Sequence, residues 1–260
     1  MQRATRRLTE AGPYVLQGYE WDSRVNRYRS DDTGRYVART RITELLGRST
    51  ADRESRLRSG VQTFIDGGIS ENTWLVRSAN MLARDHIQHA ALAAGGWDRL
   101  TPADRAGIAQ RLAGDFERLR KLGNGITSGD ISAAQAQARM DMYVGHSRAE
   151  FFVIERDRLP KPAEGMVTIE RRTLHSAHPC KDCIEFHDRG WQPEGDLPLP
   201  TEESVCDGNC RCTMDRKDVP TSQAAGWIGH RGGPGDEMAD AGYAEADAAT
   251  SAHQPMDTPQ

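Results

Sequence analysis

Five cysteines are the residues of this chain best suited to chemistry, and all lie in one short window. Structural zinc sites take four thiolates, or three thiolates and one histidine. Because five cysteines exceed four ligands, one is left over, and His175, His178 and His187 are nearby substitutes. We predict a structural Zn²⁺ site, with a disulfide set or free thiols as the alternative. The candidate ligands form a CxxC pair, then 22 other residues, then a CxxxCxC group, namely Cys180, Cys183, Cys206, Cys210 and Cys212.

Catalytic interpretations of the same window are weaker. The segment from Pro179 to Cys183 resembles half of a nucleobase-deaminase motif, but no histidine of the chain has glutamate two residues later, where the proton shuttle is needed. There is also no HExxH, no phosphate-binding glycine loop and no GxSxG. Glu185 and Asp188 beside His187 form the remaining acid–base candidate, and a solvated loop is the commoner role of such groups. We expect a protein that is not an enzyme, with no catalytic or cofactor-binding residue besides the metal ligands.

The N-terminal part of the chain carries an excess of positive charge, and the C-terminal part carries an excess of negative charge. Residues 1–60 hold 13 basic against 8 acidic residues, and residues 215–260 hold 3 against 8. The total is −4, which excludes a wholly basic nucleic-acid coat. No apolar stretch approaches the roughly 18 residues of a membrane helix, and the Arg-rich N-terminus lacks the apolar run of a signal peptide. We therefore expect a cytosolic protein without a membrane partner.

Amphipathic helices with capping signals should position the cysteine window. Thr101, Pro102 and Asp104 form the clearest helix start, and Ser132 with Gln135 forms a capping box. His86, His89 and His146 fall in these helices without metal-ligand spacing, which favours structural roles. The expected helices run, in chain order, from Ser49 or Thr50 to Gly67, from Ser70 to Gly95, from Thr101 to Gly123, and from Ser132 to about Glu155.

On both sides of these predicted helices, the sequence pattern favours β structure. Tyr28 to Val37 contains Asp-Asp-Thr-Gly and predicts a short hairpin with Gly34 at positive φ. Met166 to Glu170 alternates like a strand. The fold class is therefore mainly α, with antiparallel helical hairpins followed by a small loop-rich α+β module and disordered termini. The expected domains are a basic arm (1–48), a helical domain (49–159), a Cys-rich module (160–216) and an acidic disordered tail (217–260).

The motifs in this order resemble a known family. A Gly-Asp-Ile-Ser helix start, Arg-Ala-Glu-Phe-Phe, Arg-Arg-Thr-Leu, CxxC and a final Cys-Arg-Cys resemble the Mu protein F-like family of phage head morphogenesis proteins, also called minor head proteins. Four cysteines fall on the family's positions, and Cys206 stands where many members have histidine. The resemblance covers residues 100 to 215, with the family pattern matched at Cys180, Cys183, Cys210 and Cys212.

The resemblance implies a minor component of a tailed-phage head, near the portal vertex. It implies the portal protein and other head proteins as partners, contact with packaged or ejected DNA, and a location in the virion after assembly in the host cytoplasm. One alternative is a zinc module that binds DNA through the basic arm, although residues 180–212 are mainly acidic. A toxin or nuclease-type enzyme is the weakest alternative, because no catalytic group is complete.

Overall fold

The chain forms two compact units, here called the helical unit and the sheet unit. The computed structural model describes residues 18–175 and 179–232. Among the described residues, the helical unit comprises 18–161 and 199–211, and the sheet unit comprises 162–175, 179–198 and 212–232. The predicted boundary at 160 is close to the observed one. The segment 199–211, expected in the Cys-rich module, belongs instead to the helical unit, because its backbone packs on a helix there.

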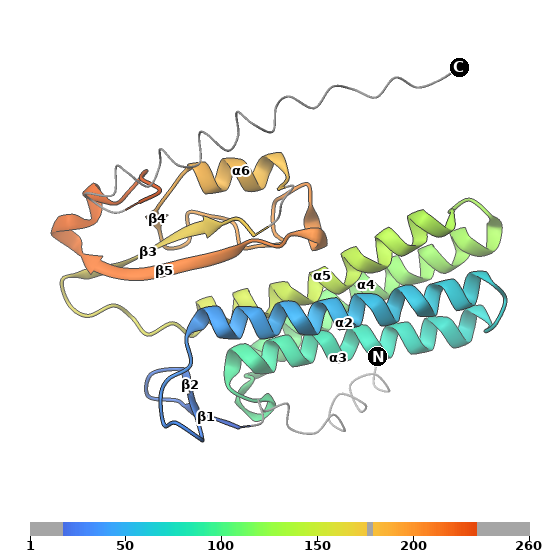
Figure 1. The fold of residues 1–260 in the computed structure, drawn as a ribbon, viewed down its shortest axis with the longest axis horizontal. Coiled ribbons are helices and arrows are strands. Elements are labelled where there is room, and N and C mark those ends of the chain that lie inside the picture. Colours follow the sequence, from blue (N-terminus) through green and yellow to red (C-terminus); the bar gives the residue numbers. More distant parts are fainter. Residues whose placement is uncertain (1–17, 176–178, 233–260) are drawn as a thin grey trace, which may run out of the picture. The chain divides into compact units, whose positions relative to one another are not determined.

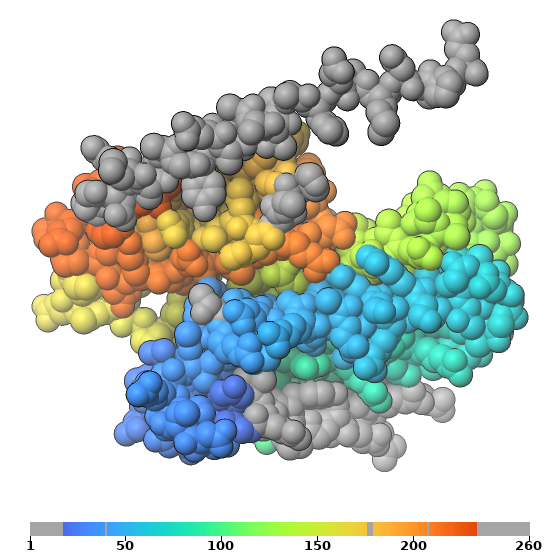
Figure 2. All heavy atoms as spheres, in the orientation of Figure 1, coloured from blue at the N-terminus to red at the C-terminus, as the bar shows by residue number. Residues whose placement is uncertain are grey.

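Four long helices build the helical unit and run side by side in Figure 1. Short connections join consecutive helices, so neighbours along the chain are antiparallel. Their core holds Leu57, Trp74, Leu119 and Met140, all at most 1% exposed. Atoms of the first long helix form a continuous band across the visible face of this unit in Figure 2. The elements are α2 (Arg39–Ile65), α3 (Glu71–Ala94), η1 (Trp97–Arg99), α4 (Pro102–Ser128), α5 (Ala133–Asp157) and η2 (Asp207–Asn209).

The capping signals of the sequence are confirmed. Ser70 accepts a hydrogen bond from the Thr73 amide at the start of α3. Thr101 and Asp104 form the reciprocal capping box of α4, and Ser132 and Gln135 form that of α5. These side chains satisfy amide groups that the first turn of a helix leaves without an intrahelical acceptor. The local sequence alone therefore sets three of the four starts.

The start of α2 was predicted wrongly. The helix begins at Arg39, ten residues before the predicted position near Ser49. Ile42 and Leu46 are buried and continue the spacing of three and four residues that leads to Leu57 and Val61. No side chain caps this start, which follows an extended Ala38, so the sequence carried no capping signal there.

The end of α4 was also predicted wrongly, because Gly123 does not stop the helix. The helix continues to Ser128, and Gly129 ends it with φ 81°. A Cβ on Gly123 would lie 3.0 Å from both Glu71 Oε1 and Trp74 Cζ3. Gly123 therefore permits close packing of α4 against α3. From the sequence alone, a glycine with this role cannot be distinguished from one that ends a helix.

A β-hairpin precedes the helices, although its strands differ from those expected. Strands β1 (Tyr19–Asp22) and β2 (Arg27–Ser30) pair antiparallel around a turn upstream of the predicted one. The predicted turn exists, with Gly34 at φ 65°, but it closes only an isolated bridge between Arg29 and Tyr36. The Tyr28 hydroxyl donates to the Leu92 carbonyl and so ties the hairpin to α3.

The sheet unit contains a three-stranded antiparallel sheet in the order β4-β3-β5 (Figure 1). The expected strand at Met166 is confirmed, and it extends to Thr173. Ile169, Trp191 and Val219 form a small buried core. Between the central strand β3 and its neighbour β5, the carboxylate of Glu170 accepts a hydrogen bond from Arg216 at 3.2 Å. The elements are β3 (Met166–Thr173), α6 (Lys181–Asp188), β4 (Gln192–Pro193), β5 (Thr213–Pro220) and η3 (Thr221–Gly226).

The predicted disordered tail begins too early at residue 217. Strand β5 runs through Pro220, η3 follows, and the described chain continues to residue 232. Lys217 lies over the rings of Trp191 and Trp227, with its Nζ 3.9 and 2.9 Å from the ring centroids. These contacts and the packing of Ile228 on the small core hold the segment. The remainder of the tail (233–260) and of the basic arm (1–17) lies outside the described residues.

Among the described residues, no helix combines the length and apolarity that a membrane span requires.

The capping box of α4 gives a test of how the helical unit is stabilised. Thr101→Ala removes the hydroxyl that accepts from the Asp104 amide, and we expect a loss of about 1 kcal/mol in unfolding free energy. Denaturant unfolding followed by helical circular dichroism measures the change.

Thr63→Ala is the matched control. The Thr63 hydroxyl is exposed in the last turn of α2 and donates to the Ser59 carbonyl. Alanine there should leave stability unchanged or slightly raised. Equal losses in the two variants would contradict a specific role for the cap.

Candidate metal centre

The CxxC pair is arranged by the first turn of α6. Cys180 is the N-cap of this helix, and its sulfur accepts a hydrogen bond from the Cys183 amide at 3.4 Å. Cys183 lies in the first turn and is buried. The amide hydrogen bond and the positive end of the helix dipole both favour negative charge on the Cys180 sulfur. The pair is therefore suited to bind metal as thiolate.

A glycine contact fixes the loop that carries Cys206 and Cys210. Gly208, in η2, packs directly against Gly145 of α5. A Cβ on Gly145 would lie 1.4 Å from the Gly208 carbonyl oxygen, and one on Gly208 would lie 1.8 Å from the Met142 carbonyl oxygen. Only residues without a side chain can approach this closely, so α5 determines where the loop runs.

Arg148 adds a polar contact to the same loop. Its side chain is buried in α5, and its Nη1 donates a hydrogen bond to the Cys210 carbonyl oxygen. The guanidinium also lies over the Phe152 ring, 5.9 Å from its centroid. The loop is thus held by close backbone packing at Gly208 and by the hydrogen bond from the charged guanidinium of Arg148 to the Cys210 carbonyl.

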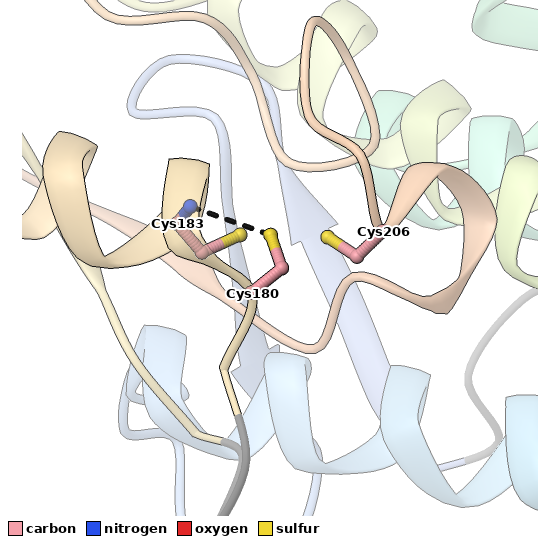
Figure 3. Close-up of side chains that lie close together, drawn as sticks. All are labelled: Cys180, Cys183 and Cys206. Atoms are coloured by element: carbon pink, nitrogen blue, oxygen red, sulfur yellow. Dashed lines mark hydrogen bonds between the residues drawn. The ribbon is translucent and has the colours of Figure 1, made fainter.

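The five predicted ligands are brought together. Cys180, Cys183 and Cys206 form one group whose sulfur atoms all lie within 4.8 Å of one another, and Cys183, Cys210 and Cys212 form a second. Figure 3 shows the sulfur atoms of the first group pointing toward one another. A tetrahedral site with zinc–sulfur bonds of about 2.3 Å has sulfur–sulfur edges of about 3.8 Å, so these separations fit zinc after small adjustments.

Comparisons with protein-family models, with curated proteins and with solved structures found no match to this chain.

Cys183 is common to both groups, which makes it the central ligand of the cluster. The structure does not join the five cysteines in disulfides. Cys183, Cys210 and Cys212 are at most 2% exposed, whereas Cys180 and Cys206 are partly exposed. A cluster of thiols this shielded from water can bind a soft or borderline metal ion tightly and exclude competing ligands.

The histidines expected as substitute ligands are not part of either group. His175 shares a hydrogen bond with the Thr213 hydroxyl at 2.9 Å, and His187 Nδ1 donates to the Arg172 carbonyl at 2.9 Å. His178 lies outside the described residues. Asp188, weighed above as part of an acid–base group, pairs with Arg231. The described ligands are therefore cysteines alone.

Sequence reasoning missed the residues that support the cysteine loop. Gly208 stands between two cysteines and offered a weak signal, since glycine in such a segment allows close backbone approach. Gly145 and Arg148 carried no signal, because each resembles an ordinary position in the long α5 helix. Their roles depend on contacts between residues about sixty positions apart.

Gly145→Ala tests whether α5 positions the loop. The new Cβ would overlap the Gly208 carbonyl, so the loop must move and carry Cys206 and Cys210 with it. We expect zinc affinity to fall about 10- to 100-fold, the range typical for loss of support around metal ligands. Competition with a chromogenic chelator measures it.

Gly60→Ala is the control for a glycine-to-alanine change in a helix. Nothing lies within 4 Å of a Cβ at Gly60 in α2. This variant should keep its zinc affinity and gain about 0.5–1 kcal/mol of stability. Unchanged affinity in Gly145→Ala would show that α5 does not position the loop.

Proposed function

We propose that this protein is a non-enzymatic minor head component of a tailed phage, with a structural Zn²⁺ held by its cysteine cluster. The observation that supports the zinc part of the proposal is the convergence of cysteines that lie up to 32 positions apart in the sequence, counted from Cys180 to Cys212. The portal protein and other head proteins are the proposed partners. The head of the virion is the proposed location.

The ligand set favours a structural over a catalytic metal. Catalytic zinc sites use three protein ligands and keep one position for water, whereas structural sites are closed by four. This cluster offers five thiols, and three of them are buried. A fourth thiolate would fill the position that a catalytic water needs.

The sheet unit also has a physical need for metal. Among its described residues, the buried apolar side chains besides the cysteines are few, namely Ile169, Trp191, Leu197, Met214 and Val219. A core this small contributes little hydrophobic stabilisation, and small domains commonly require a metal or disulfides to fold. Zinc binding would supply that free energy, because the site forms only in the folded chain.

The head-protein role rests on the order of motifs in the sequence. The CxxC pair and the Cys-Arg-Cys end resemble the C-terminal module of the Mu protein F-like family, and they follow a helical region as in that family. The helical unit offers long exposed helix faces that can serve as a partner surface. The same resemblance supplies the proposed place near the portal.

Ion pairs in the helical unit weaken the DNA-binding alternative. Residues 1–60 carry the basic excess, and most arginines in their described part, 18–60, form ion pairs with carboxylates, which leaves less positive charge for phosphates. The pairs include Arg24–Asp22, Arg29–Glu20, Arg39–Glu155, Arg41–Glu44, Arg53–Asp85, Arg56–Asp52 and Arg58–Asp141.

Metal analysis tests the structural zinc. The purified protein should contain about one equivalent of zinc, and a strong chelator should increase hydrogen exchange in β3, α6 and β5. Cys183→Ser should lose zinc, because Cys183 belongs to both thiol groups. Among the other four cysteines, at least one serine variant should keep it, since five thiols exceed four ligands. A zinc content below about half an equivalent, with unchanged exchange after chelation, would refute the site.

Portal binding tests the proposed role. The zinc-loaded protein should co-purify with the portal protein encoded in the same phage genome, and the complex should persist at moderate salt. Zinc-bound Gly60→Ala provides a folded control that should bind equally. Failure to bind portal or procapsids would refute the head role while leaving the zinc site intact.

A further inference from the structure

A buried histidine lies between two acidic side chains in the helical unit. His86 of α3 is 0% exposed. Its Nδ1 lies 2.8 Å from Glu150 Oε1 of α5, and its Nε2 lies 3.0 Å from Asp115 Oδ2 of α4. One imidazole ring therefore links three helices through both of its nitrogen atoms.

Both carboxyl groups are held in their ionised form by further donors. Glu150 accepts two hydrogen bonds from the guanidinium of Arg111. Asp115 accepts from Arg118 at 2.9 Å and from His146 Nδ1 at 2.8 Å. Burial alone would raise the pKa of each carboxyl, but these hydrogen bonds and those from His86 lower both pKa values below their ordinary range.

This arrangement determines the protonation of His86. A carboxylate has no proton to donate, so each ring nitrogen must donate one. A neutral imidazole would direct a nitrogen lone pair at a carboxylate oxygen and leave two buried acceptors facing each other, which is costly. The imidazolium form satisfies both contacts and neutralises part of the negative charge.

We propose that His86 is a proton-binding site that holds α3, α4 and α5 together as a permanent imidazolium at neutral pH. The proposal is independent of the metal and of the head-protein role. It makes the stability of the helical unit depend on a single buried proton. An alkaline medium that removes this proton would loosen the packing of the three helices.

The remaining charged groups around His86 agree with this assignment. Burial raises the pKa of Asp85 to about 6, and Arg53 of α2 pairs with it at 2.8 Å. Burial lowers the pKa of His89 to about 3, so His89 is neutral and adds no competing charge. Arg148 of α5 and Glu54 of α2, which pairs with Arg211, complete the buried charges on the helices packed against α3.

The same groups do not form a metal site. Among the described residues, only cysteines bring three potential ligand atoms within 4.8 Å of one another. The imidazole ring separates the Asp115 and Glu150 carboxylates, so their oxygens do not converge on a common point. The ligand bound between them is a proton.

The direction of the pH effect follows from the pKa of His86. Burial would lower this pKa, but the hydrogen bonds from His86 to Asp115 and Glu150 outweigh burial and raise it above 6.5. The folded state therefore binds a proton that the unfolded state releases above about pH 6.5. The stabilisation is complete below that pH and is lost as pH rises through the folded pKa, with the folding constant falling about tenfold per pH unit.

Nitrogen NMR of the zinc-loaded full chain tests the protonation directly. In a ¹⁵N-histidine-labelled sample at pH 7, both ring nitrogens of His86 should have the chemical shifts of a protonated imidazolium. His89 is an internal control, because its Nδ1 is near the Ser147 hydroxyl at 2.8 Å and its Nε2 has no hydrogen-bond partner. An unprotonated nitrogen in His86 would overturn the proposal.

Unfolding measurements on a matched pair of variants test the consequence. His86→Gln should lose the decline in folding constant above pH 6.5, whereas His230→Gln, at an exposed histidine, should keep it. If His86→Gln does not fold, the NMR result on the native chain still decides. An identical pH slope in His86→Gln and the native chain would overturn the proposal.

Discussion

The close contact between Gly145 and Gly208 is the constraint on which the cysteine site depends. It brings the backbone of the 206–210 loop against α5 at a distance that no side chain permits. Arg148, one turn further along α5, then binds the Cys210 carbonyl. A long helix whose sequence looks unremarkable therefore positions the loop that carries two of the five thiols, Cys206 and Cys210.

That packing includes an unusual amount of buried charge. His86, Asp115 and Glu150 are all at most 1% exposed and link α3, α4 and α5. Buried ionic groups add little net stability compared with apolar contacts, but they penalise every arrangement that leaves one of them unpaired. In this unit they fix the relative positions of three helices, including α5, whose face supports the cysteine loop.

Much of the architecture could be predicted from local signals. A serine or threonine hydroxyl can accept a hydrogen bond from the backbone amide three residues later, and this local contact does not depend on the tertiary surroundings. For this reason the sequence marks the helix starts at Ser70, Thr101 and Ser132. The strand at Met166 and the five candidate ligands also follow from short-range pattern. The errors arose where distant contacts override local preference, as at Gly123, which packs against Trp74 instead of ending α4.

The sequence by itself determined that thiols cluster in one window, that capped helices precede them, and that His86 has no ligand at metal spacing. These features depend on residue type and on spacing between residues that are close together in the sequence. Only the tertiary structure decided that Cys183 is common to both thiol groups, that α5 supports the loop of Cys206, and that two carboxylates enclose His86. Each of these joins residues far apart in the chain, and such pairings arise only when helices pack and water is excluded.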